Sequence, residues 1–314
     1  MKLATSTGDF CRFLTTTEAI AAFKGSPFKY INLEQTGQEN NATLLDDSDN
    51  GWKRLADDWG NAAAKAGVKF VVSHSPCLED PDLPQDTEEY KNRIRAIRRS
   101  IEICHILDIP RIVVHACTNT KNTVEQCFAY NKKWYTDILD LAEKYNITIM
   151  TENVADVRHF FATGQQLRAF LDYMDHPLLA ACWDTAHCNL DTTAREIGQY
   201  NNILAVGDKL KGLHISDNFS DGGHHHTWPF AGNICWDQIM QGLLDVNYDG
   251  FFTFEAAYTL KHHKAPPRSR KPWEHNGEVI TKLLDPSLEL KKKANDLLYE
   301  TGKYILETYD CFEE

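Results

Sequence analysis

The chain has 314 residues, of which 42% are hydrophobic and 25% are charged, so it has ample material for a folded core. Its formal net charge of −12 repels polyanions, and we expect no nucleic acid partner unless a local basic patch overcomes that field. No apolar run approaches the roughly 18 residues of a membrane span, and the amino terminus lacks the apolar stretch of a secretory signal, so the sequence predicts a cytoplasmic protein without membrane contact.

Short runs of β-forming residues alternate along the chain with longer segments of helical periodicity. The clearest helical segments are residues 90–107, where Ile94, Ile97 and Ile101 share one face, and residues 131–146. The β-like runs are, in chain order, KLATSTG (2–8), KYINLE (29–34), VKFVVSH (68–74), PRIVVH (110–115), ITIMTE (147–152), LAACWD (179–184), LKGLHISD (210–217) and GFFTFE (250–255).

Strands that alternate with helices in this way predict a parallel sheet. Eight repeats favour a sheet that closes into a (β/α)8 TIM barrel, an α/β fold, as a single domain over residues 1–314. An open doubly wound sheet is the alternative, which the lack of a GxGxxG motif after an early strand disfavours.

Ionisable residues stand at the ends of seven of these runs. Active sites of TIM barrels lie at the carboxyl ends of the strands. One such residue alone is typical of a structural hydrogen bond, but burying so many charges at one mouth is costly unless a cation or a substrate pairs them. The residues are Glu34, His74, His115, Glu152, Asp184, His214 and Glu255.

Glu152, Asp184, His214 and Glu255 come from four successive predicted strands, and a barrel would bring them to one point. Three carboxylates and one imidazole suit one divalent metal ion of intermediate hardness, such as Mn²⁺, Co²⁺ or Zn²⁺.

Further imidazoles are expected at the same rim, where they would orient a hydroxylated substrate or hold a second metal. Spacing leaves these two roles open for His74, His115 and His187. The loop at 224–226 is either a solvated run of three histidines or a segment that directs His226 into the site. We expect the substrate-binding residues to be His74, His115, His187, His226 and Glu34.

The chain after the eighth predicted strand is expected to form an inserted loop at about 256–284 and then a closing helix over 286–309. No acidic residue occurs from 261 to 271, so this part is a clamp for an anionic substrate, a docking segment for a partner subunit, or a solvated insertion. Its basic residues are Lys261, Lys264, Arg268, Arg270 and Lys271. The expected packing residues of the closing helix are Leu288, Leu290, Leu297, Leu298 and Ile305.

Several longer motifs carry a family resemblance: TEN at 151–153, WDTAH at 183–187, GLHISDN at 212–218, HTWPFAGNICW at 226–236 and NYDGFFTFE at 247–255. The chain resembles the xylose-isomerase-like TIM-barrel superfamily, which includes sugar isomerases and epimerases, inosose dehydratases and DNA-repair enzymes of the endonuclease IV type. The resemblance runs roughly from Leu3 to Glu255. It implies that Glu152, Asp184, His214 and Glu255 bind one metal and that the two glutamates form the acid/base pair.

The sequence departs from two branches of that superfamily. In the ketose 3-epimerases that the chain resembles, a glutamate follows the first metal glutamate by six residues and an arginine follows the metal histidine by six residues. This chain has Arg158 and Ser220 at these positions. The residues that bind the substrate are therefore expected to differ from those of ketose 3-epimerases. Endonuclease IV has nine zinc ligands, and His224 stands where its ninth, an aspartate, is expected. The other eight match His74, His115, Glu152, Asp184, His187, His214, His226 and Glu255.

The predicted function is a divalent-metal-dependent isomerase or epimerase of a small sugar or polyol-derived ketone, by proton transfer through a metal-stabilised enediolate. One alternative is a dehydratase or other lyase on a keto-sugar or keto-inositol at the same metal site. A zinc phosphodiesterase of the endonuclease IV type is another, disfavoured by the net charge of −12 and by His224. A further alternative is a catalytically inactive barrel that serves as a subunit of a larger assembly, but such a protein would not need a complete set of metal ligands. We expect a small carbohydrate as the binding partner. The sequence is compatible with both a monomer and a homo-oligomer.

Overall fold

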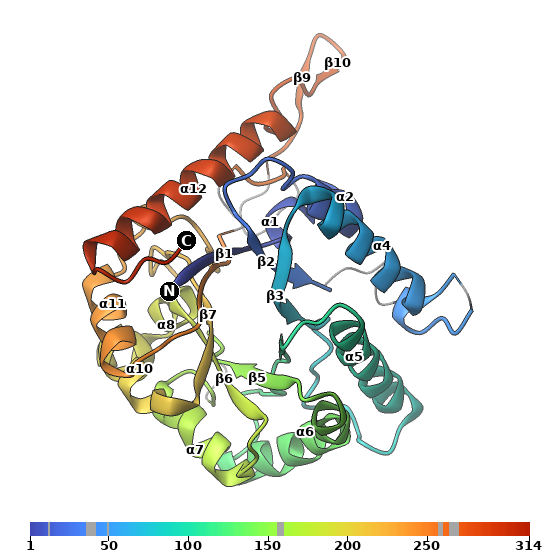
Figure 1. Cartoon of the computed structure of the whole chain (residues 1–314), viewed down its shortest axis with the longest axis vertical. Helices are drawn as coiled ribbons and strands as arrows, with labels where there is room; N and C mark the ends of the chain where they lie inside the picture. The colour runs from blue at the N-terminus through green and yellow to red at the C-terminus, as the bar shows by residue number, and fades with distance from the viewer. Residues whose placement is uncertain (12, 36–41, 49, 156–159, 257–259, 264–269) are drawn as a thin grey trace.

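Eight parallel strands form a nearly closed barrel in the computed structural model, which describes residues 1–11, 13–35, 42–48, 50–155, 160–256, 260–263 and 270–314 (Figure 1). From β1 to β7 each strand pairs with its sequence neighbour, and β1 also pairs with β8. The strands are β1 (Lys2–Ser6), β2 (Tyr30–Glu34), β3 (Lys69–His74), β4 (Arg111–Val113), β5 (Thr148–Glu152), β6 (Leu179–Asp184), β7 (Leu210–His214) and β8 (Phe251–Phe254).

The barrel closes between β7 and β8 one residue beyond the end of β7. The Ile215 amide donates a hydrogen bond to the Thr253 carbonyl at 2.8 Å, and the Glu255 amide donates to the Ile215 carbonyl at 3.0 Å. These bonds place Glu255 beside the end of β7. The predicted single-domain TIM barrel is confirmed, and the alternative of an open doubly wound sheet is wrong.

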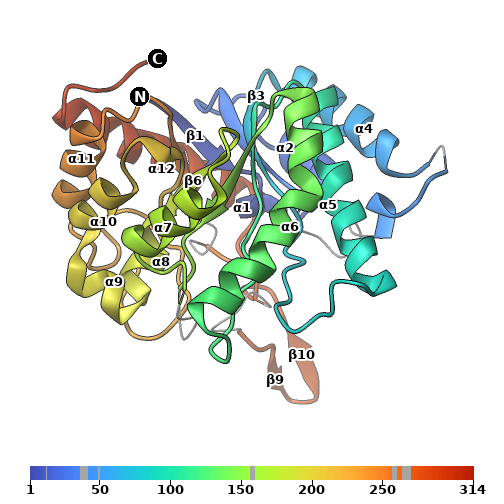
Figure 2. The same cartoon turned by 90° about the horizontal axis from the view of Figure 1, so that it is seen from below.

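Helices surround the barrel on its outer side (Figures 1 and 2). Helix α5 is capped by Thr87 and begins close to its predicted start, whereas α6 begins seven residues before the predicted 131. A capping box between Thr123 and Gln126 fixes the earlier start of α6. The helices are α1 (Gly8–Cys11), α2 (Thr16–Ala21), α4 (Trp52–Ala66), α5 (Glu88–Ile106), α6 (Val124–Tyr145), α7 (Gly164–Met174), α8 (Thr185–Leu190), α9 (Thr192–Ile197), α10 (Gln199–Val206), the 3-10 helix η1 (Gly207–Lys209), α11 (Trp236–Asp245) and α12 (Leu288–Thr308).

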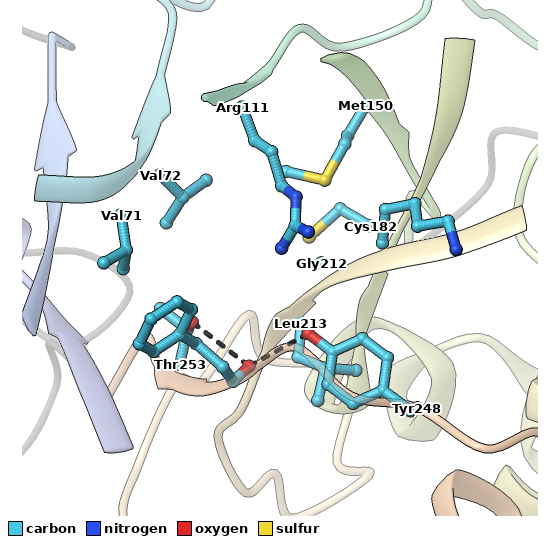
Figure 3. Close-up of a pocket in the computed structure, with 11 residues that line it drawn as sticks. Val71, Val72, Arg111, Met150, Cys182, Gly212, Leu213, Tyr248 and Thr253 are labelled. Carbon is cyan, nitrogen blue, oxygen red and sulfur yellow. Dashed lines mark hydrogen bonds between the residues drawn. The ribbon is translucent and has the colours of Figure 1, made fainter. Parts of the chain in front are cut away.

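The amino end of the barrel is filled by side chains. Val71, Val72, Met150 and Phe251 line the small cavity there, and Gly212 is needed because a Cβ at this position would lie 2.7 Å from the Met150 sulfur (Figure 3). The cavity has a volume of about 10 Å³, room for about one water molecule. A sugar-sized substrate therefore has no space at this end.

The segment after β8 contains a projecting hairpin of β9 (Trp273–His275) and β10 (Glu278–Ile280), visible at the top of Figure 1. Arg270 joins the two ends of this insertion, because its guanidinium donates to the carbonyls of Lys261 and Leu284. Lys264 and Arg268 lie outside the described residues.

Helix α12 packs on a different face from the one that the sequence suggested. Leu298 and Ile305 are buried as expected, but Leu288, Leu290 and Leu297 are 36%, 49% and 56% exposed, so their assignment as packing residues was wrong. The buried face follows helical spacing rather than hydrophobicity and consists of Lys291, Asn295, Leu298, Gly302, Ile305 and Leu306. Among the helices that the structure describes, none combines the length and hydropathy needed to cross a membrane.

Candidate metal centre and active site

Asp184 stands at the junction between β6 and α8. It is the last residue of β6 and the N-cap of α8, and its Oδ1 accepts a hydrogen bond from the His187 backbone N–H at 2.6 Å. Its buried Oδ2 has no hydrogen-bond partner within the described part of the chain. Asp184 therefore caps α8 with one carboxylate oxygen, and its other oxygen is available to a ligand at the barrel mouth.

Asn153 fixes the position of Asp184, a role that the sequence reasoning missed although it quoted the TEN motif. Its side-chain oxygen accepts from the Asp184 backbone N–H at 2.6 Å, and its side-chain nitrogen donates to the Asp184 carbonyl at 2.9 Å. Its own carbonyl lies 2.8 Å from His187 Nδ1. The ends of β5 and β6 are thus tied together beside the spare carboxylate oxygen.

His214 lies between two carboxylates, one from β5 and one from the segment just after β8. Its Nδ1 is 2.9 Å from Glu152 Oε2, at the end of β5, and 2.8 Å from Glu255 Oε2, just after β8. The directions of these contacts are wrong for hydrogen bonds, and neither ring nitrogen of His214 has a hydrogen-bond partner among the described residues. The structure thus brings Glu152, His214 and Glu255 into contact.

Three more imidazoles surround Glu152. Its Oε2 lies 3.3 Å from His115 Nε2 and 3.7 Å from His74 Nε2, and its Oε1 lies 3.2 Å from His187 Nδ1. Burial opposes ionisation, but His214 and the other imidazoles outweigh it and hold the pKa of Glu152 well below its usual range. Burial also lowers the pKa of His74 and His187, but nearby carboxylates raise both to about 9.

Glu34 lies next to His74 in the register between β2 and β3. Its Oε1 accepts hydrogen bonds from the Ser6 hydroxyl at 2.8 Å and the Asn32 side-chain amide at 3.0 Å. Burial raises the pKa of Glu34, with His74 opposing this effect. Two of the predicted substrate-binding residues, Glu34 and His74, therefore occupy the same side of the mouth.

His226 reaches the site from the loop after β7. Its side chain is 8% exposed, and its Nδ1 lies 3.6 Å from Asp184 Oδ2 and 3.8 Å from Glu255 Oε1. His225 is also buried, whereas His224 is exposed. The burial of the second and third histidines favours the interpretation in which this loop directs His226 into the site over that of a solvated run.

Asp217 organises that loop and was missed by the sequence reasoning. Its carboxylate accepts hydrogen bonds from the backbone amides of Phe230 and Ile234 and from the Trp236 indole, at 3.0, 3.1 and 3.3 Å. A buried aspartate with three such donors holds the loop in one conformation. The signal was an aspartate directly after a strand, three residues beyond His214.

Of the two positions that depart from ketose 3-epimerases, the structure describes Ser220. Ser220 turns into the loop, where its hydroxyl accepts from the Asn233 side chain at 2.8 Å. Arg158 lies outside the described residues.

The residues present fit a divalent cation. Asp184 has a buried spare oxygen, and His214 Nδ1 lies between two carboxylates rather than being hydrogen-bonded to either. Three carboxylates and one imidazole suit Mn²⁺, Co²⁺ or Zn²⁺. The groups whose ligand atoms all lie within 4.8 Å of one another include His74 with His115 and Glu152, and His187 with His224 and His226.

Solved structures share this fold over nearly the whole chain. A D-psicose 3-epimerase from Clostridium cellulolyticum H10, solved with D-tagatose, has a TM-score of 0.70 and 16% identity, covering 98% of this chain and 99% of that one. The IOLI protein, solved with a bound zinc atom, has a TM-score of 0.61 and 16% identity, covering 83% of this chain and 92% of its own. At these identities the likeness shows the fold alone.

Curated relatives match over shorter stretches. A ketose 3-epimerase of Arthrobacter globiformis is 23% identical over 196 residues, which cover 62% of this chain and 63% of that protein. An L-ribulose 3-epimerase of Methylomonas sp. (strain DH-1) is 28% identical over 118 residues, which cover 38% and 34%. Both matches span less than two thirds of the relative's own length.

The family model described as "Xylose isomerase-like TIM barrel" matches residues 21–282, most of the chain and all of the barrel from β2 to β8. The chain belongs to the xylose isomerase-like TIM barrel family.

Proposed function

We propose that the protein is a divalent-metal-dependent isomerase or epimerase of a small sugar or polyol-derived ketone. The observation that carries this proposal is the convergence of Glu152, Asp184, His214 and Glu255 at one end of the barrel, with His214 Nδ1 within 2.9 Å of two carboxylates. The fold relatives include sugar epimerases, which supports a carbohydrate as the substrate class.

These four residues would hold one divalent ion. When bound, such an ion supplies positive charge that stabilises the negative oxygens of an enediolate. The chain's own contribution is to fix the ligand directions: Asn153 clamps Asp184, and closure of the barrel sets Glu255.

Glu152 and Glu255 act as the acid/base pair. Glu255 is 27% exposed and can reach a substrate in the mouth, whereas Glu152 is 1% exposed and lies deeper, among the imidazoles. A carboxylate on one side of the substrate removes the proton next to the carbonyl and becomes the carboxylic acid, and the other, after taking up a proton from solvent, donates it to the opposite face of the enediolate. The low pKa of Glu152 and Glu255 keeps both ionised and ready to act as bases.

The imidazoles orient the substrate's hydroxyl groups. Each of these imidazoles lies within 3.7 Å of a carboxylate oxygen, His74, His115 and His187 beside Glu152 and His226 beside Asp184. Imidazoles donate or accept hydrogen bonds according to their tautomer, which suits a polyhydroxylated molecule.

The test is to incubate the protein with Mn²⁺, Co²⁺ or Zn²⁺ and a panel of ketopentoses, ketohexoses and keto-glycosides, and to separate products by chromatography. We expect a product of unchanged mass that differs in configuration or carbonyl position. Loss of water from the substrate would instead identify a lyase. Cleavage of a DNA duplex with an abasic site, in the absence of any sugar product, would identify a phosphodiesterase.

A further inference from the structure

A second group of ligand atoms lies beside the four-residue centre without sharing any of its members. Cys77 and Glu79 belong to the loop after β3, and His115 follows β4. The Cys77 Sγ, a Glu79 carboxylate oxygen and a His115 ring nitrogen all lie within 4.8 Å of one another. Glu79 Oε1 is 3.2 Å from His115 Nδ1, and these two side chains are only 15% and 16% exposed. Cys77 is an exposed free thiol.

His115 faces a carboxylate with each of its ring nitrogens. Nδ1 lies 3.2 Å from Glu79 Oε1, and Nε2 lies 3.3 Å from Glu152 Oε2 and 3.1 Å from His74 Nε2. A neutral imidazole has one N–H, so when Nε2 carries the proton, Nδ1 directs its lone pair at the Glu79 carboxylate. A positive charge on the Nδ1 side, shared with Glu79, removes that repulsion and leaves Nε2–H to donate to Glu152.

We propose that Cys77, Glu79 and His115 Nδ1 form a second metal site, selective for a thiophilic divalent ion such as Zn²⁺ or Co²⁺. Sulfur, nitrogen and oxygen donors together suit these ions, and a thiolate discriminates against Mg²⁺ and Mn²⁺. Three protein ligands leave a fourth position for water, the pattern of an open zinc site.

The distance between the Glu79 and His115 ligand atoms agrees with tetrahedral coordination. With metal–nitrogen and metal–oxygen distances of about 2.0–2.1 Å, two such ligand atoms lie about 3.3 Å apart. Glu79 Oε1 and His115 Nδ1 are 3.2 Å apart. The exposed Cys77 lies at the solvent side, so the ion can enter without passing the four-residue centre.

Binding at this site couples to the neighbouring centre through one side chain. The ion displaces the Cys77 thiol proton and any proton on His115 Nδ1, since both atoms bind metal only when deprotonated. His115 then has a single fixed tautomer, with its Nε2–H directed at Glu152 Oε2. The inference does not depend on the reaction that the protein catalyses.

Cobalt titration of the metal-stripped protein tests the site directly. Cobalt bound to a thiolate has a sulfur-to-metal charge-transfer absorption in the near ultraviolet, which the four-residue centre lacks because it has no sulfur ligand. We expect two Co²⁺ per chain and this absorption band in the wild type. Cys77→Ser should bind one Co²⁺ without the band. Cys235→Ser, a matched control at another exposed free cysteine, should retain both ions and the band.

Two more variants separate this site from its neighbours. Asp184→Asn should weaken the four-residue centre and keep the band. Cys182 lies within 4.8 Å of Glu152 and His214 ligand atoms, so Cys182→Ser tests the other nearby sulfur and should also keep the band. The proposal is overturned if the wild type lacks the band, or if the band survives in Cys77→Ser and disappears in Cys182→Ser. A protein that lacks the band but converts ketoses retains the proposed function and loses only this inference.

Discussion

Asp184 accepts the backbone N–H of His187 with Oδ1 at 2.6 Å, while its buried Oδ2 has no hydrogen-bond partner among the described residues. The two oxygens therefore have separable roles, one in helix capping and one in the metal binding that we propose. Asparagine keeps an oxygen for the cap but removes the negative charge.

We therefore expect Asp184→Asn to fold with nearly unchanged thermal stability and to weaken metal binding by at least about tenfold, the smallest loss typical of disturbing a metal site. Calorimetric titration of the stripped protein with Mn²⁺ measures the affinity. Asp191→Asn is the matched control, because Asp191 caps α9 through the Ala194 backbone N–H at 2.9 Å. Equal affinities in the two variants would remove Asp184 from the ligand set.

The stability of the metal-free protein should fall with rising pH. The pKa of His74 and of His187 in the folded protein is about 9, because carboxylates outweigh burial, against an ordinary value of 6.5. A group whose pKa is raised on folding stabilises fully below its unfolded value and loses this contribution as pH rises through its folded value. The melting temperature of EDTA-treated protein should therefore decline between pH 6.5 and 9.

Saturating Mn²⁺ should flatten this decline, since the bound cation takes over the pairing that the protonated imidazoles provide. His176→Gln, at a surface histidine that contacts Glu143 at 3.1 Å, should keep the wild-type pH profile. A melting temperature that rises over this pH range in the metal-free protein would contradict the charge pairing described for the site.

His187 should affect the substrate more than the metal. Its Nδ1 lies 3.2 Å from Glu152 Oε1 and 3.9 Å from Asp184 Oδ1. Loss of one hydrogen bond of about 1.5 kcal/mol to the substrate lowers kcat/KM about tenfold. Steady-state kinetics of His187→Ala, together with metal analysis, should show this loss with metal occupancy at the four-residue centre nearly intact. Collapse of that occupancy would make His187 a ligand instead.

Gly302 sets how closely α12 approaches the barrel. A Cβ at this position would lie 2.7 Å from the Phe254 ring and 2.8 Å from Leu3 Cδ2. Alanine gains about 1 kcal/mol in helix propensity, but overpacking costs about 1–3 kcal/mol. We expect Gly302→Ala to lower the free energy of unfolding in urea by about 1 kcal/mol on balance, whereas Thr301→Ala, one residue away, should not. A stabilised Gly302→Ala protein would show that α12 is free to shift.

The barrel was predictable from the sequence because its signal repeats. Seven of the eight β-like runs ended near an ionisable residue, so an error in a strand boundary did not change the predicted site: β4 ends at Val113, yet His115 still reaches the mouth. The start of α6 was missed because the capping box of Thr123 and Gln126 was not considered. Leu290 and Leu297 were assigned to the core of α12 by hydrophobicity, whereas helical spacing from Leu298 and Ile305 excludes them.

The rest of the site depends on loops, which have no periodic signal. Cys77 and Glu79 follow β3 by three and five residues, and their position is set by distant contacts, such as the hydrogen bond from the Arg93 guanidinium to the Leu78 carbonyl at 3.0 Å. Asp217 similarly accepts hydrogen bonds from residues 13 to 19 positions further along the chain. Sequence motifs identify residue types at strand ends, but only tertiary packing determines which loop residues join them.

The most direct test of the proposed proton transfer is hydrogen exchange with solvent. The metal-loaded protein is incubated in deuterated buffer with a ketose that it binds, and deuterium at the carbon next to the carbonyl is followed by NMR. We expect incorporation by the wild type and a loss of at least about 10²-fold in Glu152→Gln and in Glu255→Gln at verified metal occupancy. Glu143→Gln, at an exposed glutamate, should exchange like the wild type. Turnover without deuterium incorporation, or undiminished exchange in both glutamine variants, would contradict the account.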